Sequence, residues 1–315
     1  MKRYITIDGG TTNTRVSLTE DGRIIATKKI SRGARAGIDD RQGLKIDLKT
    51  AISTLLCENA VTEGDITRII ASGMITSEFG LYEIPHLTAP AGIKELHNSM
   101  AEVSFPEISN IPFLFVRGIK VSSDSLAEFD MMRGEETELM GLITLCGVEK
   151  DALFVLPGSH SKIITLDNCG RIASFSTMLT GEMLLSLSQN TILKDAVDIT
   201  VDEQNDEYLL KGYRFAKTEG LNKALFKVRI LKNAFKRSPV EVYSFFLGAI
   251  LADEIDCILK SSASTVVIGG REQIKSPTAT LISLLSDKRV IPVSPELVNA
   301  STARGAVEIF EYKDL

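Results

Sequence analysis

The hydrophobic pattern of this chain occurs twice, about 150 residues apart. Each copy has three short apolar runs that predict β-strands; these cover residues 3–8, 14–19 and 23–30, and then 152–156, 162–166 and 171–177. The turns between the first three runs contain Gly9-Gly10 and Asp21-Gly22, which are typical of β-hairpins. The repeat therefore predicts two related sheets within one chain.

Alternating helices and strands follow each set of three strands. Apolar residues spaced by three and four predict a helix over 41–58. Further helices are expected at about 134–145, 181–193, 220–260, 272–285 and 295–311, and further strands at 66–71, 111–116, 265–268 and 289–293. Antiparallel strands followed by helix–strand alternation predict an α/β protein, with duplicated mixed β-sheet domains and helices on both faces.

The length of 315 residues favours two domains. We expect an N-terminal lobe at 1–132 and a C-terminal lobe at 133–315, the second with a helical insert at about 196–260. The final helix is a candidate to pack back on the first lobe. Residues 196–220 are polar and weakly periodic, which favours a mobile loop.

Composition narrows the range of partners. Hydrophobic residues make up 44% and charged residues 24%, as in soluble proteins with a core. The net charge is −5 and no run of Lys and Arg is present, which argues against nucleic-acid binding. An anionic substrate must then be met by a few local cations.

Cysteines and apolar segments favour the cytoplasm. Four scattered cysteines without a C-x-x-C motif are expected to be reduced thiols, not disulfides or metal ligands: Cys57, Cys146, Cys169 and Cys257. The most apolar stretch, 240–259, carries four acidic residues and is too interrupted to span a membrane. Because the N-terminus enters a strand directly, we expect no signal peptide.

The tip of the first hairpin has the residues of a phosphate site. Glycines let the backbone approach a phosphate, and threonine hydroxyls can donate hydrogen bonds to it; these residues are Gly9, Gly10, Thr11 and Thr12. Asp8 could hold Mg²⁺ through water, and Arg15 could reach a phosphate or an acidic substrate. The alternative is a tight hairpin with a solvated arginine.

A second turn of the same type strengthens the phosphate interpretation. It consists of Gly158, Ser159, His160, Ser161 and Lys162. The chain has no P-loop, protein-kinase signature or Rossmann glycine motif, so nucleotide binding by those routes is unsupported. His86 and His97 are expected to be structural or exposed.

Gly269-Gly270 follows the apolar run 266–268 and precedes a helix. Such a pair opens room for adenine or ribose at the end of a strand, although a plain strand-to-helix turn would look the same. Thr180 is expected to cap the helix that follows it.

A dense group of charges lies where the two halves join. Phosphoryl transfer to an alcohol needs a carboxylate near the attacking hydroxyl and cations near the developing charge. Asp130, Glu135 and Glu136 are the candidate acids, and Arg133 is a candidate clamp. The alternative is a solvated helix start with acids in its first turn.

These motifs resemble those of the superfamily of sugar kinases, hexokinases, Hsp70-type ATPases and actin. More narrowly, the chain resembles the 2-dehydro-3-deoxygalactonokinase family over nearly its whole length. The matching stretches are 7–15, Gly73-Met-Ile75, Pro90-Ala-Gly92, Met132-Arg-Gly-Glu-Glu-Thr137, Leu156-Pro-Gly-Ser-His-Ser-Lys162, Met178-Leu-Thr-Gly-Glu182 and 268–272. Thr76-Ser77 and Gly80-Leu81 depart from the family pattern.

The resemblance implies a two-lobed actin-like ATPase (ribonuclease H-like) fold. It also implies a phosphotransferase that uses ATP and Mg²⁺ to phosphorylate the C6 hydroxyl of 2-dehydro-3-deoxy-D-galactonate, in galactonate catabolism. Because acids at the crossover helix accept the proton in related sugar kinases, Asp130 is the first candidate base and Glu135 the second. If the 76–81 loop lines the sugar pocket, the departures there could alter the preferred substrate.

Other functions stay open. One is a kinase for a related sugar or 2-keto-3-deoxy acid. A second is a non-catalytic sugar sensor on the same fold, although the sequence shows no room for a DNA-binding domain before Tyr4. A third is a chaperone-type or actin-like ATPase. The partner is expected to be a small sugar acid, with neither nucleic acid nor membrane, and a homodimer is left open.

Overall fold

A computed structural model describes residues 1–34, 40–270 and 272–313. It divides into two compact units. Unit 1 contains Met1–Lys150, Leu166–Ser174 and Glu296–Leu315, and unit 2 contains Asp151–Thr165 and Phe175–Pro295. The predicted boundary at 132/133 falls inside unit 1 in this division.

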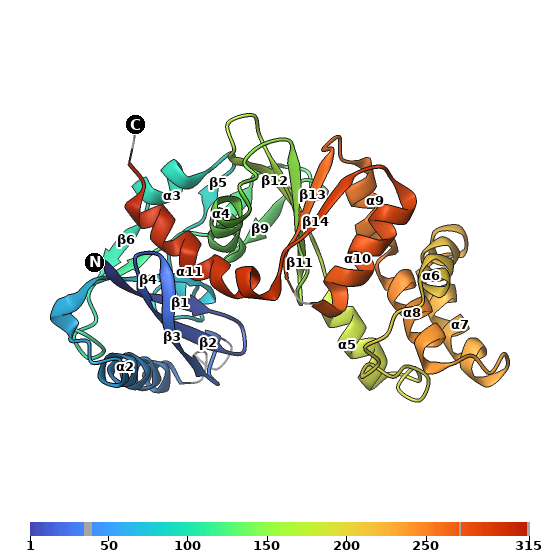
Figure 1. The fold of residues 1–315 in the computed structure, drawn as a ribbon, viewed down its shortest axis with the longest axis horizontal. Helices are drawn as coiled ribbons and strands as arrows, with labels where there is room; N and C mark the ends of the chain where they lie inside the picture. Colours follow the sequence, from blue (N-terminus) through green and yellow to red (C-terminus); the bar gives the residue numbers. More distant parts are fainter. Residues whose placement is uncertain (35–39, 271, 314–315) are drawn as a thin grey trace. The chain divides into compact units, whose positions relative to one another are not determined.

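The sheet of unit 1 has the strand order β3-β2-β1-β4-β7-β6 (Figure 1). Its strands are β1 (Arg3–Gly9), β2 (Thr14–Glu20), β3 (Arg23–Ile30), β4 (Ile66–Gly73), β6 (Ala101–Val103) and β7 (Phe113–Phe115). A smaller sheet has the order β5-β8-β9, formed by Leu87–Thr88, Ile119–Val121 and Asp130–Met132. The predicted hairpins of the first three strands are confirmed, since β1–β2 and β2–β3 pair antiparallel.

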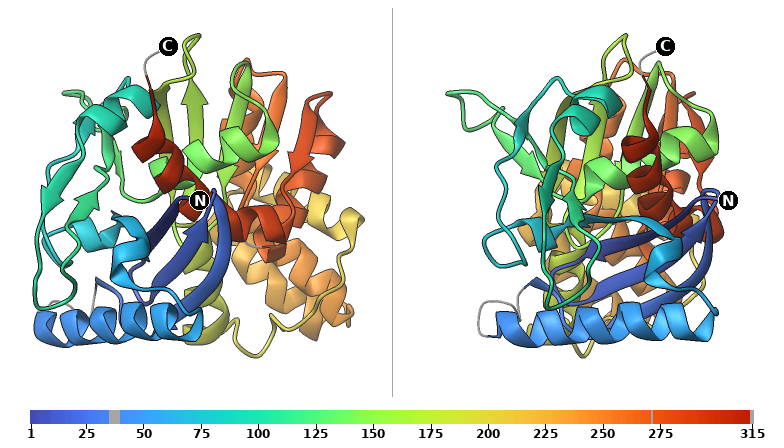
Figure 2. Two further views of the ribbon diagram at one scale, coloured as in Figure 1. Left: turned by 60° about the vertical axis from the view of Figure 1, so that its left-hand side comes forward. Right: turned by 90° about the vertical axis from the view of Figure 1, so that its left-hand side faces the viewer.

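Helices cover both faces of the larger sheet in unit 1. Helix α2 (Arg41–Glu58) packs its apolar side on β2 and β3 (Figure 2). The remaining helices of this unit are α3 (Ile93–Asn98), α4 (Glu135–Cys146) and α11 (Pro295–Glu311), with short 3₁₀ turns at Glu63–Asp65 and Met74–Thr76.

Helix α11 returns to unit 1, where the Tyr4 hydroxyl donates to Glu311 Oε1 at 2.6 Å. It also crosses α4 with backbone contact, because a Cβ on Gly141 would lie 1.9 Å from the carbonyl oxygen of Ser301. This close pairing of α4 and α11 keeps residues 135–146 with the N-terminal part of the chain.

The sheet of unit 2 has the order β12-β11-β10-β13-β14. Its strands are β10 (Ala152–Leu156), β11 (Ser161–Leu166), β12 (Ile172–Met178), β13 (Thr265–Ile268) and β14 (Arg289–Pro292). Its helices are α5 (Thr180–Asn190), α6 (Asp206–Glu219), α7 (Leu221–Asn233), α8 (Pro239–Ile250), α9 (Ala252–Lys260) and α10 (Glu272–Leu285). The antiparallel β10–β11 hairpin corresponds to the β1–β2 hairpin of unit 1. The parallel pairing of β10 with β13 corresponds to that of β1 with β4.

One prediction for the helical insert is wrong. Residues 206–219 form helix α6 instead of part of a loop, since Asn205 caps its start and a short apolar face packs on α8. The helices expected across 220–260 are confirmed as α7, α8 and α9, and Ser238 caps the start of α8 with Pro239 in its first turn. Residues 243–250 of α8 are buried on all sides.

Candidate active site

The first hairpin is held from behind by backbone. A Cβ on Gly9 would lie 2.7 Å from the amide nitrogen of Ile75, and a Cβ on Gly73, whose φ is +80°, would lie 2.5 Å from the Gly9 carbonyl oxygen. The amide of Ala34 donates to the Gly10 carbonyl oxygen at 3.0 Å. The tip residues Thr11 and Thr12 are exposed. Glycines therefore fix the hairpin while its hydroxyl groups stay accessible.

Asp8 is the next-to-last residue of β1, at the base of this hairpin. It pairs with Arg15 on β2 and lies in register with Ser72 on β4. Burial raises the pKa of Asp8, the Arg15 charge lowers it, and the Glu135 charge raises it further. The structure thus brings three of the predicted site residues, Asp8, Arg15 and Glu135, into one electrostatic cluster.

Helix α4 adds two acids to this cluster. Burial, followed by the nearby charges of Asp8 and Glu135, raises the pKa of Glu138 to about 8, although Arg15 lowers it. Burial and the Glu135 charge raise the pKa of Glu136 to about 8 as well. Glu136 is fully buried, and both its carboxyl oxygens accept from the Gly134 amide, at 2.9 and 2.8 Å. Sequence reasoning missed Glu138, although its three-residue spacing from Glu135 puts both on one helix face.

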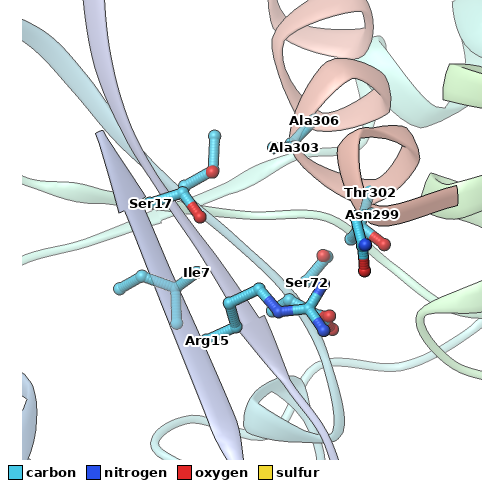
Figure 3. A pocket seen from close by; sticks show the side chains of 10 residues that line it. Ile7, Arg15, Ser17, Ser72, Asn299, Thr302, Ala303 and Ala306 are labelled. Carbon is cyan, nitrogen blue, oxygen red and sulfur yellow. The ribbon is translucent and has the colours of Figure 1, made fainter. Parts of the chain in front are cut away.

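A small pocket adjoins Asp8 in unit 1 (Figure 3). Figure 3 shows Arg15 and Ser72 on the strand side, and Asn299 and Thr302 on the side of α11. The Ser72 hydroxyl is buried and has no hydrogen-bond partner among the residues described. Residues of the first hairpin thus share a small pocket with the final helix.

Asp8 and the acids near it suit a cation that keeps most of its water ligands better than one coordinated entirely by protein side chains. Within the described ranges, no three His, Cys, Asp or Glu side chains are grouped to hold a metal ion. Mg²⁺ usually keeps several waters and takes one or two carboxylates together with substrate phosphates. Asp8 and its acidic neighbours fit that mode of binding.

Asp130 lies on an edge strand, β9, opposite Val121. It precedes helix α4, which begins at Glu135, so it is not part of the crossover helix itself. Its Oδ1 accepts from the Met131 amide at 2.7 Å, and the residue is half-buried. The other candidate base, Glu135, interacts electrostatically with Asp8.

Arg133 binds the loop that follows β4. Its Nη1 donates to the carbonyl oxygen and the hydroxyl of Thr76 at 2.8 and 2.6 Å, and its Nη2 donates to the Ile84 carbonyl oxygen at 3.0 Å. Nη2 also lies 3.2 Å from His86 Nδ1. Burial, with the Arg133 charge second, lowers the pKa of His86 to about 4. Arg133 thus holds residues 76–86 in place.

The two departures from the family pattern lie inside the protein. Thr76 is fully buried, and its hydroxyl donates to the Gly73 carbonyl oxygen at 2.9 Å. Leu81 is buried in the core under the sheet of unit 1. These side chains can influence a substrate only through the position of the loop backbone.

The second hairpin is backed by glycines in the same manner. A Cβ on Gly181, in the first turn of α5, would lie 2.3 Å from the Gly158 carbonyl oxygen. The Glu182 amide donates to the Ser159 carbonyl oxygen at 3.2 Å, and His160 Nε2 lies 3.1 Å from Glu182 Oε1.

Ser161 and Lys162 are buried, so the accessible predicted phosphate contacts of this hairpin lie before them. Thr180 is not the cap of α5: Leu179 occupies that position, and Thr180 is the first helical residue.

Gly269-Gly270 lies against the base of the second hairpin. The Gly269 amide donates to the Val155 carbonyl oxygen at 2.9 Å. Gly270 has φ +70°, and a Cβ there would lie 2.1 Å from the Pro157 carbonyl oxygen. Only glycine fits this position. The structure therefore brings together the two glycine motifs that the sequence assigned to nucleotide binding.

A pocket opens beside the start of α10, directly after these glycines in sequence. Its lining comes from the loop before α6, from α8 and from α10: Val201, Asp202, Glu203, Gln204, Tyr243, Leu247, Glu272, Gln273, Ser276 and Pro277. The Tyr243 hydroxyl is buried without a hydrogen-bond partner in the described chain. The pocket offers apolar and aromatic surface with acceptors around it, a lining suited to a flat heteroaromatic ring.

No helix among the described residues is long and apolar enough to cross a membrane.

The chain has the fold of actin-like ATPases and sugar kinases. It is similar to a solved Sinorhizobium meliloti protein assigned as a 2-dehydro-3-deoxygalactonokinase, with a TM-score of 0.77 and 23% identity over 98% of this chain and 100% of that one. It is also similar to a ligand-bound xylulose kinase from Lactobacillus acidophilus, with a TM-score of 0.51 and 10% identity over 99% of this chain and 91% of that one. The predicted fold class is confirmed.

Sequence comparison defines the family. The profile of the family described as 2-keto-3-deoxy-galactonokinase matches residues 8–294, so the chain belongs to this family. It is 28% identical to the 2-dehydro-3-deoxygalactonokinase of Escherichia coli (strain K12) over 273 residues, 85% of each protein. The chain is accordingly a kinase, a phosphotransferase with an alcohol group as acceptor.

Proposed function

We propose that this kinase transfers the terminal phosphoryl group of ATP to the C6 hydroxyl of 2-dehydro-3-deoxy-D-galactonate. One observation carries the proposal: each unit presents a glycine-hydroxyl hairpin at the end of a β-strand, backed so closely that a side chain would clash. Such hairpins offer amide and hydroxyl donors to phosphate oxygens at no steric cost. The family relationship supplies the substrate class.

The two hairpins take different parts of the nucleotide in this proposal. The first, with Asp8 and the accessible hydroxyls of Thr11 and Thr12, binds the phosphate that is transferred. Asp8 would hold Mg²⁺, which neutralises charge on the phosphates when bound. Arg15, exposed beside Asp8, is a cation that can meet the phosphate or the carboxylate of the sugar acid.

The second hairpin and Gly269-Gly270 bind the rest of the nucleotide. Ser159 and His160 are the accessible contacts, and the pocket lined by Tyr243 and Glu272 accommodates the adenine ring. Adenine offers an exocyclic amino group, which suits the acceptors around this pocket.

Asp130 accepts the proton of the C6 hydroxyl in this scheme. As the C6 oxygen bonds to phosphorus, the bond from phosphorus to the ADP oxygen breaks and the proton passes to the carboxylate. Glu135 is the alternative acceptor, because it interacts with Asp8. Arg133 donates a hydrogen bond to Thr76 and so fixes the loop that follows β4. The backbone of this loop then shapes the sugar site.

The test is ADP formation from Mg-ATP with a panel of 2-keto-3-deoxy sugar acids, combined with ³¹P and ¹³C NMR of the product. We expect ADP release that depends on the sugar acid and a phosphate at C6. ATP hydrolysis without dependence on the acceptor would favour an ATPase, and absence of ADP with every acid would favour a sensor. Preference for another acid of the panel would change only the substrate.

A further inference from the structure

A buried carboxyl group lies beneath the second hairpin. Glu254, in the first turn of α9, is 1% exposed. Its Oε2 accepts from the Thr180 hydroxyl at 2.5 Å. Burial raises the pKa of Glu254, while its hydroxyl neighbours Thr180 and Ser161 lower it. A carboxyl in such a place is far from the usual solvent-exposed environment of glutamate.

Two atoms here make no well-formed hydrogen bond among the described residues, although the Ser161 hydroxyl lies close enough to Glu254 to lower its pKa: Ser161 Oγ and Glu254 Oε1. Ser161 is fully buried, and an unpaired polar atom inside a protein is destabilising. A protonated Glu254 would donate from Oε1 to Ser161 Oγ while Oε2 accepts from Thr180, so that one proton satisfies both atoms. The carboxyl group then bridges Ser161 and Thr180.

The bridged residues belong to two elements that meet at the hairpin tip. Ser161 begins β11 immediately after the tip, and Thr180 begins α5. The next residues of α5 contact the tip directly: Gly181 packs on Gly158, and the Glu182 amide donates to Ser159. A shift of Thr180 relative to Ser161 would therefore move the backbone that supports the tip.

We propose that Glu254 is a positioning residue that fixes the second hairpin against helix α5 and thereby sets the affinity of the hairpin for nucleotide phosphates. It acts from below through Ser161 and Thr180 and does not touch the nucleotide. The inference rests on the proposed function, in which this hairpin binds the nucleotide.

The test compares Glu254→Ala and Glu254→Gln with Ile255→Ala. Ile255 is the next residue of α9, fully buried in the apolar core, and serves as a control for lost packing. We expect Glu254→Ala to raise KM for ATP about tenfold, the usual effect of unpairing buried hydrogen-bonding groups. KM for the sugar acid should stay unchanged. Glu254→Gln should restore KM for ATP, since an amide can donate to Ser161 and accept from Thr180.

The control separates positioning from stability. Ile255→Ala should lower the melting temperature while KM for ATP stays at the wild-type value. An equal rise of KM in Glu254→Ala and Ile255→Ala, with an active wild-type enzyme, would overturn this inference alone. A wild-type enzyme without ATP-dependent phosphorylation would overturn the proposed function and the inference together.

Thr180→Val is the variant to use if Glu254→Ala does not fold. Valine keeps the shape of threonine but cannot donate to Glu254. A smaller rise in KM for ATP, without a change in KM for the sugar acid, supports the inference. An unchanged KM for ATP in folded Thr180→Val overturns it.

Discussion

The two hairpins share a backbone plan but differ in the charges around them. The first hairpin has Asp8 at its base, and this carboxyl group interacts electrostatically with Glu135 and Glu138 of helix α4. The second has Pro157 where the first has Asp8, and its ionisable contacts include the His160–Glu182 pair at the tip and buried Glu254 below. The first is thus an acidic site, and the second is a rigid backbone support.

In the proposed function, this difference gives the two hairpins different roles. Closely spaced acids repel one another unless they bind protons or a cation, which suits a site for a metal and a transferred phosphate. A tip fixed by Gly181 and Gly270 suits recognition of the part of the nucleotide that is not transferred. We therefore expect substitutions near the first hairpin to affect turnover, and substitutions near the second to affect nucleotide binding.

Asp130→Asn is expected to have the largest effect. If Asp130 accepts the C6 proton, kcat should fall on the order of 10²–10⁴-fold, the contribution typical of a general base. KM for ATP should change little. Steady-state kinetics with both substrates measure this, and Glu135→Gln is the matched variant. Near-wild-type kcat in Asp130→Asn, with a large loss in Glu135→Gln, would transfer the role to Glu135.

Asp8→Asn tests the acidic site itself. Losing the carboxylate that would hold Mg²⁺ beside the transferred phosphate should lower kcat on the order of 10²–10³-fold. The Mg²⁺ concentration needed for half-maximal activity should also rise, because the remaining amide is a weaker ligand. Titration of activity with Mg²⁺ at fixed ATP measures both effects. Unaltered Mg²⁺ dependence would contradict a metal role for Asp8.

Gly270→Ala tests the backbone support. The new Cβ would meet the Pro157 carbonyl oxygen, and φ of +70° is unfavourable for alanine. A local strain of about 1–3 kcal/mol at this position should raise KM for ATP roughly tenfold or more. Gly147→Ala is the control, because it shares a positive φ but has no atom within 4 Å of the added Cβ. The prediction fails if both variants change KM for ATP equally.

The acids of α4 should make stability depend on pH. Glu138 has a pKa of about 8 against an ordinary 4.5, so the folded protein binds more protons between these values. The resulting stabilisation is complete below pH 4.5 and is lost as pH rises towards 8. Its slope is at most about 1.4 kcal/mol per pH unit for one group.

Denaturant unfolding from pH 5 to pH 8 measures this slope. Glu138→Gln should reduce it relative to the wild type, since the amide does not titrate. Glu136 and Glu254 also have raised pKa values, so part of the slope should remain. An identical slope in wild type and Glu138→Gln would show that Glu138 does not titrate in this range.

Local patterns in the sequence predict most of the fold. Apolar runs separated by short turns predict both hairpins. The glycine pairs predict the places where two backbones come into contact. Helix α6 was missed because its buried face consists of a few residues, among them Gly212 and Ala216, which carry little hydrophobic signal. Contacts between residues far apart in sequence could not be predicted from local patterns. Arg133, for example, donates hydrogen bonds to Thr76 and Ile84, which lie about 50 residues before it.

The clearest test of the difference between the hairpins is calorimetric titration of ATP, with and without Mg²⁺, into Asp8→Asn and Gly270→Ala. We predict that Asp8→Asn binds metal-free ATP like the wild type but loses the gain in affinity that Mg²⁺ provides. Gly270→Ala should bind ATP more weakly in both conditions and keep that gain. If the two variants lose metal-free affinity and Mg²⁺ dependence alike, the hairpins are equivalent and the account is contradicted.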